Sequence, residues 1–181
     1  MAVATEHVDD APARLAKQGD GAKNTVGRAV TINRPARELY AYWRDFSNLA
    51  TFMENIASIE VIDRTRSHWV VKAPAGQTVE WDAIVTDDRE GEAISWRSEN
   101  ADVTNGGTVE FRDAGERGTV VSATIHYDPP AGIIGKVIAK MFQRDPAIEM
   151  RRDLRRFKQL METGEIATNV KTRAEREKEG A

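Results

Sequence analysis

The chain contains no cysteine, only three histidines among its 181 residues, and no long apolar run. Without cysteine there is no disulfide, no thiolate metal site and no cysteine nucleophile, and this composition fits a reducing cytoplasm. No stretch approaches the ~18 apolar residues that a membrane-spanning helix requires. The first residues also lack the apolar core of a signal peptide. The sequence therefore predicts a soluble, unprocessed cytoplasmic protein.

Neither sign of charge dominates, since 26 Lys and Arg residues stand against 29 Asp and Glu, a net charge of −3. This balance gives no general reason to expect nucleic acid or an anionic membrane as partner. The hydrophobic fraction of 40% is ordinary for one globular domain. Large apolar residues are scarce near both termini. We therefore predict a disordered arm over residues 1–25, a globular domain over 26–167 and a charged flexible tail over 168–181.

The apolar pattern of the middle region is first strand-like, then helical, then strand-like again. Alternation over Gly27–Asn33 predicts a first strand, and helical spacing after Pro35 predicts two short helices, the second capped by Asp45 or Ser47. Short turns, including "NGG" and "GERG", favour an antiparallel meander for the strands after these helices. The six predicted strands are Ser58–Asp63, His68–Ala73, Thr78–Asp87, Ala93–Glu99, Gly107–Arg112 and Thr119–Tyr127.

A helical period returns after residue 132 and continues to Gly164. Asp145 and Pro146 are expected to interrupt this helix and restart it, and Gly164 is expected to end it. A long amphipathic helix must bury its apolar face, and the only large surface for it is the concave face of a curved sheet.

Alternation within the strands predicts which side chains face that helix. Placing Trp81 and Trp96 inward puts Glu80, Asp82 and Arg97 outward, where opposite charges can pair across strands. Catalysis needs ionisable groups in the cavity, so this one-sided pattern favours holding an apolar ligand over chemistry. A one-residue slip of register would reverse every assignment. The other ionisable residues predicted to face outward include His68, Lys72, Glu99 and His126.

The inward residues define a candidate ligand-binding wall. A fully packed core would show the same periodicity, so a cavity and a dry core both stay open at this point. We assign no catalytic residue and expect no metal and no cofactor. The candidate ligand-binding residues are Trp69, Val71, Trp81, Ala83, Trp96, Ser98, Phe111, Ile125, Tyr127, Ile138, Met141, Phe142 and Leu154.

Several motifs occur in a characteristic order: "VTINRPARELYAYWRDFSNLATFM", "HWVVKAP", "EWDAIV" with "ISWRS", "GGTVEF", "GTVVSATIHYDPPAGIIGKVIAKMFQRDP" and "DLRRFKQLMETGEIA". In these motifs the chain resembles the START-like (SRPBCC) superfamily, and within it bacterial polyketide cyclase/dehydrase-type proteins. The resemblance implies an α+β helix-grip (START/Bet v 1-like) fold, in which a curved antiparallel sheet of about seven strands grips a long C-terminal helix. Two short helices follow the first strand. The histidines do not match the iron site of the oxygenase branch, since His7 lies in the arm and His68 and His126 are predicted on the outer face.

The resemblance implies binding or transport of a hydrophobic small molecule, such as a lipid, a quinone or a polyketide-like compound, between sheet and helix. The alternatives are a polyketide cyclase/dehydratase-type enzyme using the same cavity, or a protein-interaction or stress-associated module with a packed core. Trp43 either gates the cavity or packs against the sheet, and "DPPAGIIG" either gates its mouth or starts the helix. The basic run over residues 151–158 is typical of a solvated helix face, and favours transient membrane-surface contact over nucleic acid.

Overall fold

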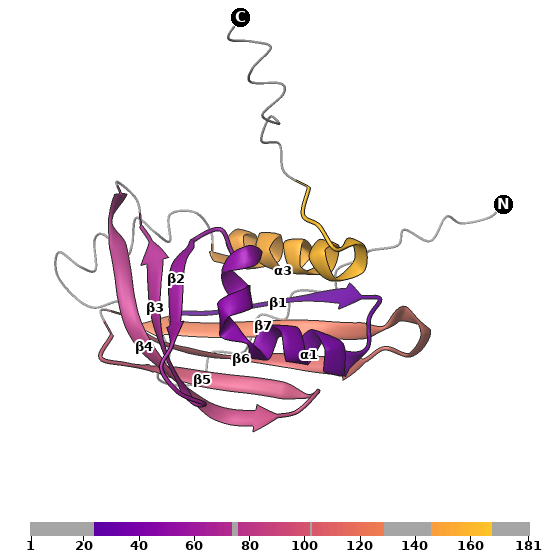
Figure 1. Ribbon diagram of the computed structural model, residues 1–181, viewed down its shortest axis with the longest axis horizontal. Helices are drawn as coiled ribbons and strands as arrows, with labels where there is room; N and C mark the ends of the chain where they lie inside the picture. The colour runs from indigo at the N-terminus through magenta and orange to yellow at the C-terminus, as the bar shows by residue number, and fades with distance from the viewer. Residues whose placement is uncertain (1–23, 74–75, 102, 129–145, 168–181) are drawn as a thin grey trace, which may run out of the picture.

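The computed structural model describes residues 24–73, 76–101, 103–128 and 146–167 (Figure 1). The predicted arm and tail lie outside the described residues. So do the first half of the long helix, the Asp145 cap and most of the "DPPAGIIG" link. Three candidate ligand-binding residues, Ile138, Met141 and Phe142, are therefore also outside the described residues.

Seven antiparallel strands form one curled sheet in the order β1-β7-β6-β5-β4-β3-β2. From β2 onward each strand pairs with the next in the sequence, which confirms the predicted meander, and β1 closes against β7. The predicted class and strand number are confirmed. The strands are β1 (Asn24–Ile32), β2 (Ile56–Val61), β3 (Arg66–Lys72), β4 (Thr78–Arg89), β5 (Ala93–Glu99), β6 (Thr104–Asp113) and β7 (Thr119–Asp128).

The prediction that "NGG" forms a hairpin turn is wrong, because both of its glycines lie within β6. Gly107 is paired with Trp96 on β5. A Cβ atom at Gly107 would lie 2.6 Å from the Trp96 indole and 2.5 Å from the carbonyl oxygen of Thr124. The missing side chain therefore lets the indole lie directly against the strand. The "GERG" turn is confirmed between β6 and β7.

The helices are α1 (Ala36–Arg44), the 3-10 helix η1 (Phe46–Thr51) and α3 (Pro146–Thr163). Asp45 caps η1, since its carboxylate accepts a hydrogen bond from the backbone N–H of Ser47. Pro146 begins α3, and Gly164 follows its end with a φ of +81°. These features confirm the predicted boundaries.

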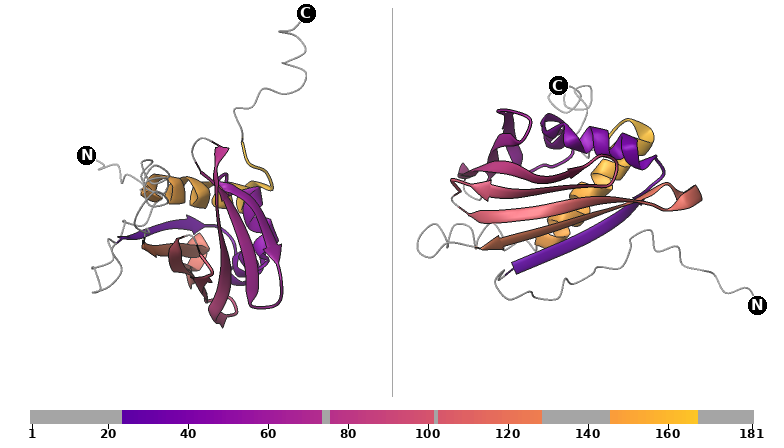
Figure 2. Two further views of the ribbon diagram at one scale, coloured as in Figure 1. Left: turned by 90° about the vertical axis from the view of Figure 1, so that its left-hand side faces the viewer. Right: turned by 90° about the horizontal axis from the view of Figure 1, so that it is seen from below.

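Helix α3 lies over the concave face of the sheet, next to β1 (Figures 1 and 2). Its C-terminal part is fixed to the end of β1 and to the link between β1 and α1. There, Arg34 Nε donates to the Met161 carbonyl at 2.8 Å, and Lys158 Nζ donates to the Thr31 carbonyl at 2.8 Å. Its first turns lie at the opposite end of the sheet, where Asn55 precedes β2. The space under α3 therefore has two distinct ends.

At the α1 end, aromatic rings fill the space between helix and sheet. The Phe157 ring lies 5.1 Å from Trp43 and 4.8 Å from Phe52, measured between centroids. Trp43 is 4% exposed, which favours packing among the two roles predicted for it. We name this set the aromatic cluster: Tyr40, Tyr42, Trp43, Phe52, Phe111 and Phe157.

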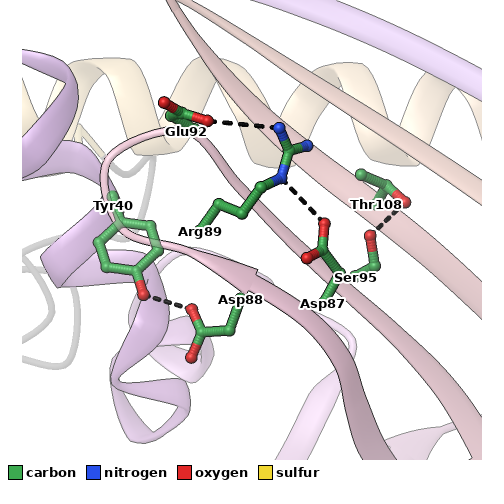
Figure 3. A network of polar contacts seen from close by, with 7 residues as sticks. All are labelled: Tyr40, Asp87, Asp88, Arg89, Glu92, Ser95 and Thr108. Atoms are coloured by element: carbon green, nitrogen blue, oxygen red, sulfur yellow. Dashed lines mark hydrogen bonds and ion pairs between the residues drawn. The ribbon is translucent and has the colours of Figure 1, made fainter.

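An irregularity in β4 brings one carboxylate to the α1 end. The pairing with β5 shifts between Val85 and Asp87, so the alternation changes phase and Asp88 pairs with Ile94. Asp88 then accepts a hydrogen bond from the Tyr40 hydroxyl (Figure 3). It also accepts one from Arg44 Nε at 2.8 Å. Asp88 lies one residue beyond the strand predicted over Thr78–Asp87, and the sequence analysis did not predict its contact with α1.

Candidate ligand-binding cavity

A cavity of about 730 Å³ lies between the sheet, η1 and α3. This volume falls within the range of about 300–1,000 Å³ that is usual for small-molecule sites. The space between the described residues of the sheet and α3 is therefore not fully packed. Its wall is mostly apolar, with tryptophans on three neighbouring strands, Trp69, Trp81 and Trp96, which we name the wall tryptophans.

The inward register predicted for the wall tryptophans is confirmed. Trp69 pairs with Trp81 across β3 and β4, and their rings stack at 6.0 Å with an interplanar angle of 16°. The Trp69 indole Nε1–H donates to the buried Ser67 hydroxyl at 2.8 Å. The opposite face carries the charges, among them a hydrogen bond of 2.8 Å between His68 Nδ1 and Asp82. Alternation thus accounts for the charged residues that flank each tryptophan in the sequence.

The cavity wall includes most of the described residues that the sequence nominated. Two do not line it: Phe111 packs in the aromatic cluster, and the Ser98 hydroxyl accepts a hydrogen bond from the backbone N–H of Asn105 at 2.8 Å. Whether the lining residues hold a ligand stays a prediction. Those on the wall are Trp69, Val71, Trp81, Ala83, Trp96, Ile125, Tyr127 and Leu154.

The end of the cavity farthest from α1 is polar. It lies where β2 and β6 begin and where β3 and β7 end, opposite the first turns of α3. Lys72, predicted to face outward, is exposed but also borders the cavity because β3 ends there. We name this region the polar end; its residues are Asn55, Lys72, Asn105, Tyr127, Glu149 and Asp153.

Two carboxyl groups of α3 belong to the polar end, Glu149 and Asp153. Burial raises the pKa of Asp153 to about 7, and the negative charges of Glu149 and Glu54 add to this shift. Arg156 and a hydrogen bond from the Glu54 backbone N–H act in the opposite direction and do not outweigh it. Asp153 therefore changes its charge near neutral pH, inside a mostly apolar cavity.

Glu54 joins the loop before β2 to α3. Its carboxylate lies 2.5 Å from Arg156 Nη1 and 3.8 Å from Arg152 Nη1, and its carbonyl accepts a hydrogen bond from Lys72 Nζ at 3.2 Å. Three cationic side chains thus converge on one residue. The predicted solvated role of the basic run is incomplete, because Arg156 is only 20% exposed and holds the loop against the helix.

The expectation that the cavity holds almost no ionisable group is wrong at α3. It considered only strand alternation, and the two acids come from the helix. The signal was present in the spacing: Asp153 lies three residues after Met150 and four before Phe157, both buried, so it shares their apolar stripe. An acid on such a stripe is a candidate for a carboxyl group that faces the cavity.

Within the described residues, no group of three or more His, Cys, Asp or Glu side chains is placed to hold a metal ion. The side chains of the cavity wall can supply hydrogen bonding along the polar end, proton exchange at Asp153, and apolar contact elsewhere. None of the described helices is long and apolar enough to cross a membrane.

A curled antiparallel sheet that grips a C-terminal helix over a cavity defines the START-like class of proteins. Residues 32–155 match the family described as "Polyketide cyclase / dehydrase and lipid transport", and the chain belongs to this family. Membership supports a role in hydrophobic ligand binding or in cyclisation without deciding between them.

Individual relatives agree with this placement. A solved Deinococcus radiodurans protein, DR_A0006, is 42% identical, with a TM-score of 0.65 over 79% of this chain and 100% of its own. An uncharacterised Streptomyces lincolnensis protein is 26% identical over 76% of this chain and 89% of its own. The Zhui aromatase/cyclase of a Streptomyces species is 14% identical, with a TM-score of 0.62 over 80% of this chain and 99% of its own. At that identity the likeness concerns the fold alone.

Proposed function

We propose that the protein binds a hydrophobic small molecule, of the lipid, quinone or polyketide-like kind, in the cavity under α3. The observation that carries this proposal is a cavity of about 730 Å³ lined by four tryptophans, the three wall tryptophans of the sheet and Trp43 of α1. Apolar surface that leaves water on binding contributes about 25 cal/mol per Å². Flat aromatic faces also favour contact with flat or conjugated ligands.

An uptake experiment with pyrene tests this proposal, since pyrene is apolar, uncharged and accepts excitation energy from tryptophan. We expect saturable transfer from the wall tryptophans to one bound pyrene per protein. The double variant Ala83→Leu/Ala123→Leu adds side chains to two buried wall positions and should weaken binding at least about tenfold, because it fills the space. Thr124→Leu, which adds the same side chain to the outer face of β7, is the matched control. Absence of saturable pyrene uptake would overturn the proposal.

The natural ligand is then identified by mass spectrometry of protein purified gently from its host, intact and after solvent extraction. A stoichiometric apolar compound that is lost in the cavity-filling variant supports carriage of that compound. A compound retained by this variant would be bound elsewhere and would contradict the cavity as the site.

A second candidate is catalysis of the cyclase or dehydratase kind, and Asp153 is the observation that favours it. A cyclodehydration needs a proton delivered to a departing hydroxyl and a proton removed from carbon, and a carboxyl with a pKa of about 7 suits both transfers at neutral pH. Asp153→Asn separates the two functions. Under catalysis it abolishes turnover of a bound polyketide-like substrate while binding persists, whereas under simple carriage no turnover is present to lose.

A further inference from the structure

We propose that the ligand is an apolar molecule with a hydroxyl or amino group at one end, and that this hydrogen-bond donor meets the carboxyl groups of Asp153 and Glu149. This inference rests on the proposed function and adds the chemistry of the ligand's polar group. The apolar body would lie against the wall tryptophans, and the donor would point to the polar end.

The two carboxyl groups are one helical turn apart on α3 and both line the cavity. The Glu149 side chain is only 17% exposed. Its polar contacts within the described residues are long, 3.4 Å from Asn55 Nδ2 and 3.7 Å from Arg152 Nη1. A buried carboxylate accepts hydrogen bonds and gains most from short, charge-assisted ones. The pair thus has acceptor capacity directed at the cavity.

The cationic side chains nearby do not make the polar end favour an anionic ligand group over a hydrogen-bond donor. Arg152 and Arg156 pair with the Glu54 carboxylate, and neither belongs to the cavity wall. Lys72 is the cationic residue on the wall, but it is exposed and donates to the Glu54 carbonyl. A ligand with a carboxylate would bring a further negative charge beside Glu149 and, above pH 7, beside an ionised Asp153, which like-charge repulsion disfavours.

The free-energy cost of burying Asp153 also favours a ligand with a hydrogen-bond donor. Removing a carboxyl group from water is unfavourable unless a partner compensates it. Within the described residues its charged form is stabilised by Arg156 and by the Glu54 N–H, against Glu149 and Glu54, which destabilise it. A ligand hydroxyl or ammonium at this position supplies the compensation, and the ammonium does so more strongly because it also carries charge.

Four probes with one ring system isolate the polar group: pyrene, 1-pyrenemethanol, 1-pyrenemethylamine and 1-pyrenecarboxylate. Energy transfer from tryptophan reports binding of each. We expect 1-pyrenemethanol and 1-pyrenemethylamine to bind about tenfold or more tightly than pyrene, and 1-pyrenecarboxylate to bind more weakly than pyrene. Asp153→Asn and Glu149→Gln should each reduce the preference for 1-pyrenemethylamine. Glu116→Gln, which removes an exposed acid in the turn before β7, should leave it unchanged.

The pH adds an independent readout. The groups that act on Asp153 are Glu149 and Arg156 on α3 and Glu54 before β2. As the pH rises through about 7, Asp153 ionises, so affinity for 1-pyrenemethylamine should rise in the wild type but not in Asp153→Asn.

The outcomes separate the two proposals. Binding of pyrene with no preference among the polar groups, or with a preference for 1-pyrenecarboxylate, overturns this inference and leaves the cavity as an apolar site. Failure of all four probes to bind overturns the proposed function together with it. The expected order of affinities, lost in the two α3 variants and kept in Glu116→Gln, supports both.

Discussion

The two ends of the space under α3 are built differently. At the α1 end, the rings of the aromatic cluster pack against one another, and most of them do not line the cavity. The Tyr40 hydroxyl donates a hydrogen bond to Asp88. At the polar end, carboxyl, amide and phenol groups border open space. One sheet and one helix therefore provide a rigid support at one end and a chemically adaptable site at the other.

Two aspartates, Asp88 at the α1 end and Asp153 at the polar end, show this difference in their pKa values. Burial pushes the pKa of Asp88 upward, but hydrogen bonds from Tyr40 and Arg44 outweigh it and leave the pKa below its usual range. Burial also raises the pKa of Asp153, and there the partners do not compensate, so it reaches about 7. The donors around Asp88 therefore offset its burial, whereas those around Asp153 do not.

The largest effect should come from the aromatic cluster. Phe157 is fully buried between Trp43 and Phe52, so Phe157→Ala leaves a cavity and should lower the free energy of unfolding by about 3–5 kcal/mol. Urea unfolding followed by circular dichroism measures this loss. Ile148→Ala, at a 55% exposed position of the same helix, should change it by less than about 0.5 kcal/mol. Equal effects of the two substitutions would contradict the assignment of the α1 end as the support.

At the polar end, a substitution should raise the free energy of unfolding instead of lowering it. Because the folded pKa of Asp153 lies above its unfolded value of about 3.9, the unfolded state releases its proton first, and Asp153 lowers stability progressively as pH rises from about 4 to 7. Asp153→Asn removes this cost, so the variant should be more stable than the wild type by about 1–3 kcal/mol above pH 7 and similar to it near pH 4.

Urea unfolding at several pH values tests this expectation, with Glu116→Gln as the exposed control. A constant offset between wild type and Asp153→Asn at every pH would show that Asp153 does not titrate in this range. Stabilisation of the ligand-free protein combined with weaker binding of an amine probe would place Asp153 among the groups that favour function at the expense of stability.

Much of the fold could be predicted because alternation and helical period each report burial directly. The inward register of the wall tryptophans followed from period two, and Asp45, Pro146 and Gly164 marked helix boundaries by their backbone chemistry. The cavity itself could not be predicted, since a packed and an open wall have the same periodicity.

The failures have local causes. The phase change in β4 has no distinct sequence signal, and it brings Asp88, just beyond the predicted end of this strand, to the α1 end. Gly106 and Gly107 suggest a turn when considered alone, although a cross-strand Trp96 requires one of them inside a strand. Strand alternation could not reveal Asp153, because the helix supplies this carboxyl group to the cavity.

A smaller loss of stability is expected when the hydrogen bond from Tyr40 to Asp88 at the α1 end is removed. Tyr40→Phe removes the hydroxyl that donates to Asp88 and should cost about 1 kcal/mol at pH 7. The Asp88 carboxylate has a lowered pKa, so its contribution is present above the unfolded pKa and is lost as pH falls through the folded one. The difference between Tyr40→Phe and wild type should therefore shrink in acid. Tyr42→Phe, whose hydroxyl bonds Thr51 at an exposed site, should have less effect.

The smallest change in stability is expected from a substitution on the outer face of the sheet, away from both ends of the space under α3. The hydrogen bond from His68 to Asp82, together with the charges of Asp82, Glu80 and Glu60, raises the pKa of the imidazole despite partial desolvation. The stabilisation is therefore complete below the unfolded pKa of about 6.5 and is lost as pH rises through the folded pKa. His68→Gln should lower the melting temperature by about one degree in mild acid and leave it unchanged in alkaline solution, as expected for a solvent-screened pair. A loss that equals that of Tyr40→Phe would mean that the outer face supports the fold as strongly as the α1 end does, and the contrast between the regions would not hold.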